Sequence, residues 1–308
     1  MNERLIVLTD VFNDVDDAVA LYALVRSGAD LAGVVTTYGN ERVKAKAASK
    51  FFKMAGRPDI QVRYSKVYKT RFSAPNDMRE TDYGFLTDDE LIAGDTVLGA
   101  NPRGEGLMEN LINSSTDRIS VLSLAPLSAL AGAMNHVKTQ RVGSIYVMGG
   151  HVGNYDNGPK VPYDRALTPE YNFACDPAAA RKVLESGAKI SLVGKNLWSK
   201  NLFTLKDFEF LSTGTQAQRE LSRMIRLRHA HNKKSLEPLG IGVELFMYDP
   251  IATCAVLFPE LYDFERIEMV VDENGVTHTK PAKEGNVYGA VNADLPEIKS
   301  RLMGLILG

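Results

Sequence analysis

Residues 5–18 read Leu5-Ile6-Val7-Leu8-Thr9-Asp10-Val11-Phe12-Asn13-Asp14-Val15-Asp16-Asp17-Ala18. The apolar run 5–8 has the length and composition of a buried strand, and the apolar residues at 18–24 predict a helix. Four aspartates lie between them, with no lysine or arginine. The order strand, acidic turn and helix is the first unit of an α/β fold.

The alternation of strands and helices continues along the chain. We expect strands at 31–37, 60–62, 119–124, 144–148 and 189–193, and helices at 43–54, 127–134, 177–185 and 216–234, the last exposed and basic. The strands are continuously apolar, which is typical of parallel strands covered on both faces. The fold class is therefore α/β, with a mainly parallel open sheet and helices on both faces.

Two late segments complete the prediction. Alternating residues around the turn Asn274-Gly275 predict a small antiparallel hairpin near the C-terminus. The apolar stretch 243–257 is interpreted as a late strand that carries Asp249. Because no linker, repeat or low-complexity segment interrupts the pattern, we expect residues 1–308 to form a single catalytic domain.

Composition limits the class of partner. The 308 residues carry a net charge of −2, so the sequence lacks the excess of basic residues that is typical of proteins that bind nucleic acid or an anionic membrane. Cys175 and Cys254 are too isolated for a disulfide framework or a zinc site, and we expect both to be buried. With no signal peptide or transmembrane segment in the pattern, we expect a cytoplasmic protein that acts on small molecules.

The acidic turn predicts a metal site. Helix capping is the alternative, but it requires only one or two acids and gives no reason for Asp10 at the strand end. Gathering carboxylates is costly unless a cation neutralises them. Oxygen ligands suit Ca²⁺ or Mg²⁺ rather than zinc, and we expect Ca²⁺ before Mg²⁺. An EF-hand is excluded, since Val15 and Leu21 stand where its glycine and final glutamate belong.

An aspartyl-nucleophile phosphatase is a competing interpretation. It places its nucleophile after the first strand, as Asp10 is placed here, but normally has a second carboxylate two residues on, where this chain has Phe12.

The turn also resembles a family signature, that of the inosine–uridine nucleoside hydrolases, in its longer form DxDxGxDVDDA. Further matching segments follow in family order: 35–40 (VTTYGN), 122–128 (LSLAPLS), 146–150 (YVMGG), 170–173 (EYNF) with 176–180 (DPAAA), and 248–252 (YDPIA). The resemblance covers most of the chain. It implies cation-dependent hydrolysis of the N-glycosidic bond of ribonucleosides by a homo-oligomer, a dimer or a tetramer.

The resemblance also assigns roles to individual residues. The expected cation ligands are Asp10, Asp17, Asp249 and the main-chain carbonyl of Leu124, with Asp10 also the general base. The expected substrate-binding residues are Asp16, Asn40, Met148, Glu170, Asn172 and Tyr248. Trp198 joins them for a different reason: it is the only tryptophan and follows the strand at 189–193, so it lies on the correct edge to stack on the base. Asp176 is expected to cap the helix that follows it instead of entering the site.

Three residues depart from the family pattern. Leu8 and Phe12 replace an aspartate and a glycine of the turn, and Tyr248 replaces a histidine that precedes the metal aspartate. The departing base would then be held by stacking on an aromatic ring, Tyr83 and Phe85 included, or meet a histidine such as His229 or His231, which otherwise are solvated surface residues. A catalytically altered metal- or nucleoside-binding protein on the same scaffold is therefore the alternative to a hydrolase.

Overall fold

The computed structural model describes residues 3–12, 14–66, 103–153, 169–198, 203–236 and 245–308; the side chains at 198, 235 and 236 lie outside this part. Its strands are β1 (Arg4–Thr9), β2 (Leu31–Thr36), β3 (Val62–Tyr64), β4 (Ile119–Ser123), β5 (Val142–Met148), β6 (Lys189–Val193), β7 (Tyr262–Val271), β8 (Thr277–Pro281) and β9 (Val287–Ala293). Its α-helices are α1 (Asp16–Arg26), α2 (Glu41–Met54), α4 (Gly104–Ser114), α5 (Ser128–Ala133), α6 (Tyr171–Cys175), α7 (Pro177–Leu184), α8 (Lys195–Trp198), α9 (Gln216–Leu236), α10 (Tyr248–Leu257) and α11 (Leu295–Leu307). Shorter 3-10 helices are η2 (Thr139–Arg141), η4 (Leu205–Thr213) and η6 (Pro259–Leu261).

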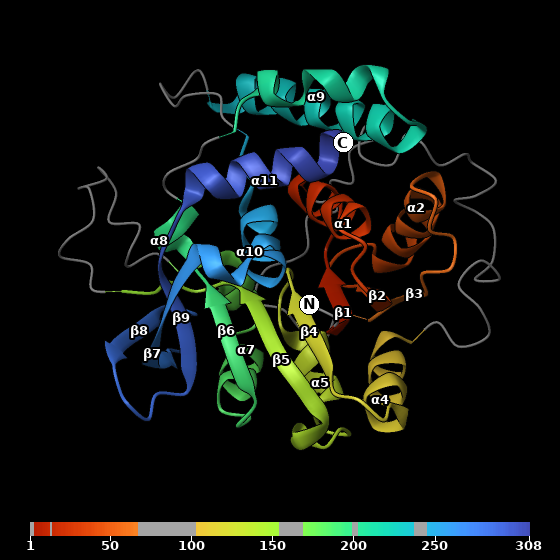
Figure 1. The fold of residues 1–308 in the computed structure, drawn as a ribbon. Helices are drawn as coiled ribbons and strands as arrows, with labels where there is room; N and C mark the ends of the chain where they lie inside the picture. Colours follow the sequence, from red (N-terminus) through yellow and green to blue (C-terminus); the bar gives the residue numbers. More distant parts are fainter. Residues whose placement is uncertain (1–2, 13, 67–102, 154–168, 199–202, 237–244) are drawn as a thin grey trace.

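The described strands form one sheet in the order β3-β2-β1-β4-β5-β6-β9-β7-β8 (Figure 1). From β3 to β9 each neighbouring pair is parallel, whereas β7 runs antiparallel to both β9 and β8. The predicted fold class is confirmed. The chain leaves β1 toward β2 and later returns to the other side of β1 as β4, so the carboxyl ends of β1 and β4 form a topological switch point, where α/β sheets bind ligands.

The predicted C-terminal hairpin is also confirmed. Its turn joins β7 to β8, and the amide of Asp272 donates to the carbonyl of Val276 over 2.9 Å. Gly275 has φ +86°, a conformation that glycine adopts without strain. The hairpin extends the main sheet through β9, which pairs with β6 on its other side.

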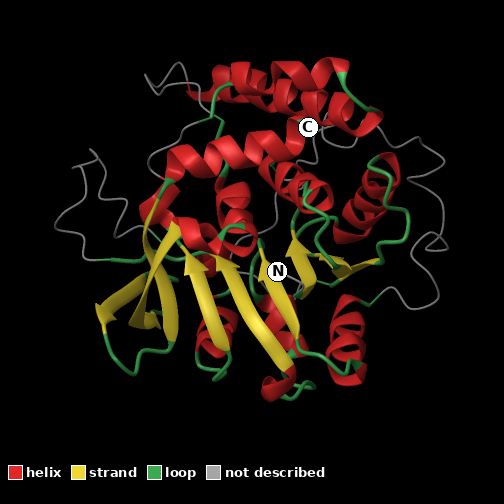
Figure 2. Cartoon of the chain, in the orientation of Figure 1, coloured by secondary structure: helices red, strands yellow, loops and turns green. Residues whose placement is uncertain are grey.

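Helices cover both faces of the sheet (Figure 2). On one face, α1, α2, α10 and α11 enclose one cluster of buried side chains, and α9 lies beyond α11 (Figure 1). On the other face, α4, α5 and α7 enclose a second cluster. Helix α9 is therefore only partly exposed: it buries Ala217, Leu221 and Ile225, and its exposed basic residues are Arg219, Arg226, Lys233 and Lys234.

The interpretation of 243–257 as a strand is wrong over the described residues 245–257. Asp249 lies in the first turn of α10, and residues 249–256 are all buried in the core. A short apolar run does not distinguish a buried strand from a buried helix. Pro250, near the helix start, was the signal in favour of a helix, because proline fits the first turn.

Cys175 and Cys254 are free and buried, as predicted. Within the described residues, no helix combines the length and apolar character needed to cross a membrane.

Candidate functional site

The carboxyl ends of three neighbouring strands carry predicted site residues. Asp10 follows β1, Leu124 follows β4 and Met148 ends β5. Asn172 of α6 connects two of these ends, because its Nδ2 atom donates to the carbonyls of Leu124 (3.3 Å) and Met148 (3.2 Å). A side chain predicted from one motif thus contacts the residues predicted from two others.

Three aspartates gather beside this edge. Asp16 and Asp17 belong to the first turn of α1, and Asp249 belongs to the first turn of α10. Each offers a carboxylate oxygen, and the three oxygens all lie within 4.8 Å of one another. With Asp10, which is 8% exposed, they form a buried acidic cluster in which the other three side chains are 2–4% exposed.

Hydrogen bonds fix the orientation of two carboxylates of the cluster. Asp16 Oδ2 accepts from the amides of Tyr248 (3.1 Å) and Asp249 (3.3 Å), so it caps the start of α10. The hydroxyl of Thr9 donates to Asp17 Oδ1 and accepts from the amide of Val11 at 3.0 Å. Capping of α1 itself does not account for these acids, since its N-cap residue is Val15 and makes no side-chain cap.

The electrostatics of the cluster favour a cation. Burial, with the nearby charge of Asp14, raises the pKa of Asp16 to about 8. Burial also raises the pKa of Asp17 and of Asp249 well above the usual range, with added repulsion from Asp10 in the first case and from Asp17 in the second. Asp249 Oδ1 is buried without a hydrogen-bond partner among the described residues. An unpartnered buried carboxylate oxygen among other carboxylates fits a hard divalent cation.

Glu170 directly precedes α6, whose Asn172 contacts this edge of the sheet. It caps α6 by accepting from the amides of Asn172 (2.9 Å) and Phe173 (3.1 Å), and it also accepts from Gly150 (3.1 Å). Burial raises its pKa to about 7. Asp176 caps α7 through the amide of Ala179 at 3.0 Å, as predicted.

Of the remaining predicted substrate residues, the structure describes the side chains of Asn40 and Tyr248. Asn40 is exposed at the start of α2, in a left-handed conformation with φ +43°. Tyr248 is half-buried, and its ring stacks on Phe246 with centroids 5.6 Å apart. The Trp198 side chain and residues 83 and 85 lie outside the described residues.

Two of the departures from the family pattern have a structural setting. Leu8 is fully buried in β1. Phe12, which stands where the family has glycine, has φ +74°, a conformation that glycine adopts more easily than any other residue. Phe12 therefore holds a backbone conformation that a glycine at this position would adopt without strain.

Sequence reasoning missed two cations near the cluster. Lys44 of α2 is fully buried, and its Nζ atom donates to the carbonyls of Asp10 and Tyr38, both at 2.7 Å. Arg228 of α9 forms an ion pair with Asp14. The basic character of α9 was visible in the sequence, but no motif distinguished Arg228 from the neighbouring His229 and His231, both half-buried.

His151 lies three residues after β5, on the same edge of the sheet. Burial, with the nearby charge of Lys195, lowers its pKa to about 4. Because a neutral imidazole donates a proton weakly, His151 is a poor acid for a departing base at neutral pH.

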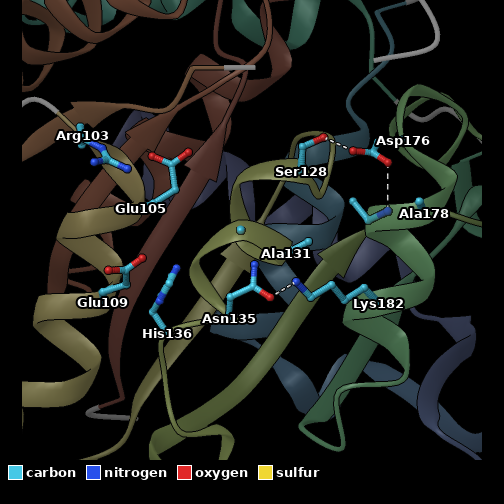
Figure 3. Close-up of a pocket in the computed structure, with 12 residues that line it drawn as sticks. Arg103, Glu105, Glu109, Ser128, Ala131, Asn135, His136, Asp176, Ala178 and Lys182 are labelled. Atoms are coloured by element: carbon cyan, nitrogen blue, oxygen red, sulfur yellow. Dashed lines mark hydrogen bonds between the residues drawn. The ribbon is translucent and has the colours of Figure 1, made fainter. Parts of the chain in front are cut away.

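A pocket of about 440 Å³ lies elsewhere, among α4, α5 and α7 (Figure 3). Several of its polar side chains are engaged with protein partners: Lys182 donates to Asn135, Asp176 accepts from Ser128 at 2.7 Å, and Glu105 accepts from Ser65. The pocket contains none of the cluster residues, so the chemistry points to the acidic edge instead.

Comparisons with known proteins identify the family of this chain. The family model described as inosine-uridine preferring nucleoside hydrolase matches residues 5–299. "Probable uridine nucleosidase 2" of Oryza sativa subsp. japonica is 28% identical over 286 residues, 89% of this chain and 80% of that protein. "Uridine nucleosidase 1" of Arabidopsis thaliana is 25% identical over 289 residues, covering 89% of this chain and 80% of the relative.

Solved structures share the fold. A purine-preferring ribonucleoside hydrolase from Gardnerella vaginalis superposes with a TM-score of 0.77 at 20% identity, covering 99% of each chain. A plant nucleoside hydrolase superposes with a TM-score of 0.75 at 23% identity, covering 100% of each chain. The match over nearly the whole length, together with the acidic cluster at the switch point, leads to one conclusion: the chain belongs to the family of inosine-uridine preferring nucleoside hydrolases and is an N-glycosyl hydrolase that converts nucleosides to free base and ribose.

Proposed function

We propose that this enzyme hydrolyses ribonucleosides with a Ca²⁺ ion held by Asp10, Asp17, Asp249 and the main-chain carbonyl of Leu124. The observation that carries the proposal is the buried acidic cluster: carboxylate oxygens of Asp16, Asp17 and Asp249, from α1 and α10, converge within 4.8 Å. Asp10 is not one of these three, but its charge helps to raise the pKa of each of them. Oxygen ligands without histidine or cysteine favour Ca²⁺, with Mg²⁺ second. When bound, such a cation lowers the pKa of a coordinated water.

Asp10 is the proposed general base. It follows β1 at the switch point, and its charge already acts on Asp16, Asp17 and Asp249, so its carboxylate is close to the proposed cation position. A carboxylate there removes the proton from the water as the water attacks C1′. The bond from C1′ to the base nitrogen breaks as the water adds, in a transition state with oxocarbenium character, and the departing base takes its proton from solvent.

The ribose is proposed to be held by Asp16, Asn40, Glu170 and Asn172, with Met148 beside them. Asn172 and Met148 are in contact, and Glu170 fixes the start of the helix that carries Asn172. A site that pairs hydroxyl groups with buried polar side chains discriminates strongly against a sugar that lacks one of them.

Tyr248 and Trp198 are proposed to bind the base by stacking. Tyr248 precedes Asp249 directly, so a base against its ring lies next to the proposed cation position. The names of the curated relatives point to uridine, whereas tyrosine in place of histidine favours a base that leaves without a strong acid. Both classes of nucleoside therefore belong in the first assay.

For the setting of the enzyme, we propose a cytoplasmic homo-oligomer, a dimer or a tetramer, that acts in purine and pyrimidine salvage. No partner other than the nucleoside substrate is proposed, neither nucleic acid nor membrane, since the net charge of −2 attracts neither. Light scattering of the purified protein measures the oligomeric state.

The function is tested by measuring free base and reducing sugar released from inosine, uridine and nicotinamide riboside, with Ca²⁺ and after treatment with EDTA. Equal amounts of base and ribose, lost with EDTA and restored by Ca²⁺, are expected. Nucleoside binding without product would instead indicate a binding protein on this scaffold. Phosphate release from a phosphomonoester would indicate the phosphatase.

A further inference from the structure

Lys44 is a buried cation that donates hydrogen bonds to two main-chain oxygens. Its side chain is fully buried in the first turn of α2. The ammonium donates to the carbonyl of Asp10 and to the carbonyl of Tyr38, each at 2.7 Å. A buried ammonium is costly unless its donors are satisfied, so the geometry of both carbonyls matters to the fold at this point.

The two carbonyls belong to segments that leave adjacent parallel strands. Asp10 follows β1 and Tyr38 follows β2, and the amide of Thr37 still donates to the carbonyl of Thr9 at 3.0 Å. Beyond that bond both backbones turn sharply: Phe12 has φ +74° and Tyr38 has φ +57°. Non-glycine residues keep such conformations only where surrounding contacts hold them, and Lys44 contacts both turns.

Each turn leads to a different half of the proposed site. The first carries Asp10 and runs into α1, which carries Asp17. The second leads through Asn40, whose carbonyl accepts from the Lys44 amide at 3.0 Å. Its Tyr38 hydroxyl also lies 2.8 Å from the hydroxyl of Tyr171, the first residue of α6, directly before Asn172.

We propose that Lys44 is a positioning residue of the hydrolase, which fixes the Asp10 turn and its cation ligands relative to the ribose-binding residues beyond Tyr38. This inference rests on the proposed function for the roles of Asp10 and Asn172. The ammonium of Lys44 holds two strained turns together. Its removal would loosen the cation site and misalign the water with C1′.

The test is Lys44→Met, which keeps the length of the side chain and removes its donors. Calcium affinity is measured by calorimetry, and kcat and KM are measured at saturating Ca²⁺. We expect calcium to bind about tenfold more weakly or worse, and kcat to fall by about 100-fold while KM changes less, because misplaced reacting groups affect the chemical step. Lys44→Gln, which restores amide donors, is expected to recover part of both losses.

Phe51→Leu is the matched control. Phe51 is fully buried two turns further along the same helix, where its ring meets Tyr22 edge to face at 6.1 Å. It is expected to lower the melting temperature but to leave calcium affinity and kcat of the folded protein unchanged. A Lys44→Met protein that behaves like this control, with both quantities within twofold of the native values, would overturn the proposal.

Two further outcomes are informative. If the native protein releases no base, the proposed function fails, and calorimetry still decides whether Lys44 positions the cation site. If the Lys44 variants do not fold, the ammonium resonance of Lys44 in the native protein is followed by NMR during a calcium titration. A shift with the calorimetric midpoint supports the proposal, and an unchanged resonance contradicts it.

Discussion

Asp16 and Asp249 are 233 positions apart in the chain, yet the amide of Asp249 donates to Asp16 Oδ2 over 3.3 Å. The first turn of α1 therefore caps the first turn of α10, and two helix N-termini meet at the acidic cluster. Helix N-termini stabilise negative charge, which offsets part of the repulsion among the carboxylates. A cation in this position would link α1 to α10.

Calcium should stabilise the fold. Because the proposed ligands come together only in the native state, a concentration 100 times the dissociation constant adds about 2.7 kcal/mol to the free energy of unfolding. The melting temperature of EDTA-treated protein should rise on addition of Ca²⁺, and Asp249→Asn should abolish most of the rise. An unchanged melting temperature in the native protein would rule out the metal site.

Without calcium, stability should fall as the pH rises from about 6.5 to about 8.5. The folded pKa of Asp16 is about 8 against a normal value of 3.8, so in this range the native state retains a proton that the unfolded state has lost. The unfolding free energy then decreases with pH. Glu170, with a pKa of about 7, acts in the same direction.

This pH range also avoids a group with the opposite effect. His151, whose pKa is lowered to about 4, makes stability rise with pH only below about 6.5. Urea unfolding at both ends of the range, with EDTA and with saturating Ca²⁺, provides the comparison. Calcium should reduce the pH dependence, because it holds the carboxylates in their charged form. A dependence unaffected by calcium would contradict the account.

The sugar is predicted to be recognised through Asp16 and Asn40. The native enzyme should favour ribosides over 2′-deoxyribosides, since the buried Asp16 would lose its hydroxyl partner, and an unpaired buried polar group costs about 1–3 kcal/mol. Asp16→Asn and Asn40→Ala should each reduce that preference in kcat/KM. Equal turnover of both sugars by the native enzyme would remove these residues from the proposed role.

The leaving group is predicted to depend on the ring of Tyr248 more than on its hydroxyl. Tyr248→Phe should keep most activity, because the stacking on Phe246 is retained, whereas Tyr248→Ala should lose about 1–3 kcal/mol of base stacking. Tyr248→His is expected to widen the range toward pyrimidines. These variants are compared by kcat/KM on inosine and uridine. A Phe variant as inactive as the Ala variant would show that the phenol takes part in the chemistry.

Much of this architecture could be predicted from the sequence, because continuously apolar strands spaced by helices are specific to a parallel sheet covered on both faces. Asp10 and Asp17 could be recognised as site residues for a physical reason. Carboxylates gathered after a strand without basic partners repel one another, which destabilises the fold unless a cation neutralises them. The C-terminal hairpin could be predicted from Asn274 and Gly275, because an Asn-Gly pair favours a tight turn whatever the rest of the fold is.

What could not be predicted depends on contacts distant in sequence. The helix around Asp249 has no polar face, so its periodicity is hidden within a continuous apolar run. Lys44 looks like an ordinary solvated residue of a charged helix, and only the fold brings it to the carbonyls of Asp10 and Tyr38. Helix α11 was missed although Asp294, which accepts from the amide of Glu297 at 3.1 Å, and Pro296 mark its start.

The role of Asp10 is the most direct test of cation-dependent hydrolysis at the acidic cluster. The measurement is the rate of base release at saturating nucleoside and Ca²⁺ for the native enzyme and for Asp10→Asn, which keeps the size of the side chain but cannot accept the water proton. General-base catalysis contributes about 10²–10⁴ to the rate, so we predict a loss of at least about 100-fold. An Asp10→Asn enzyme within a fewfold of the native rate would contradict the account.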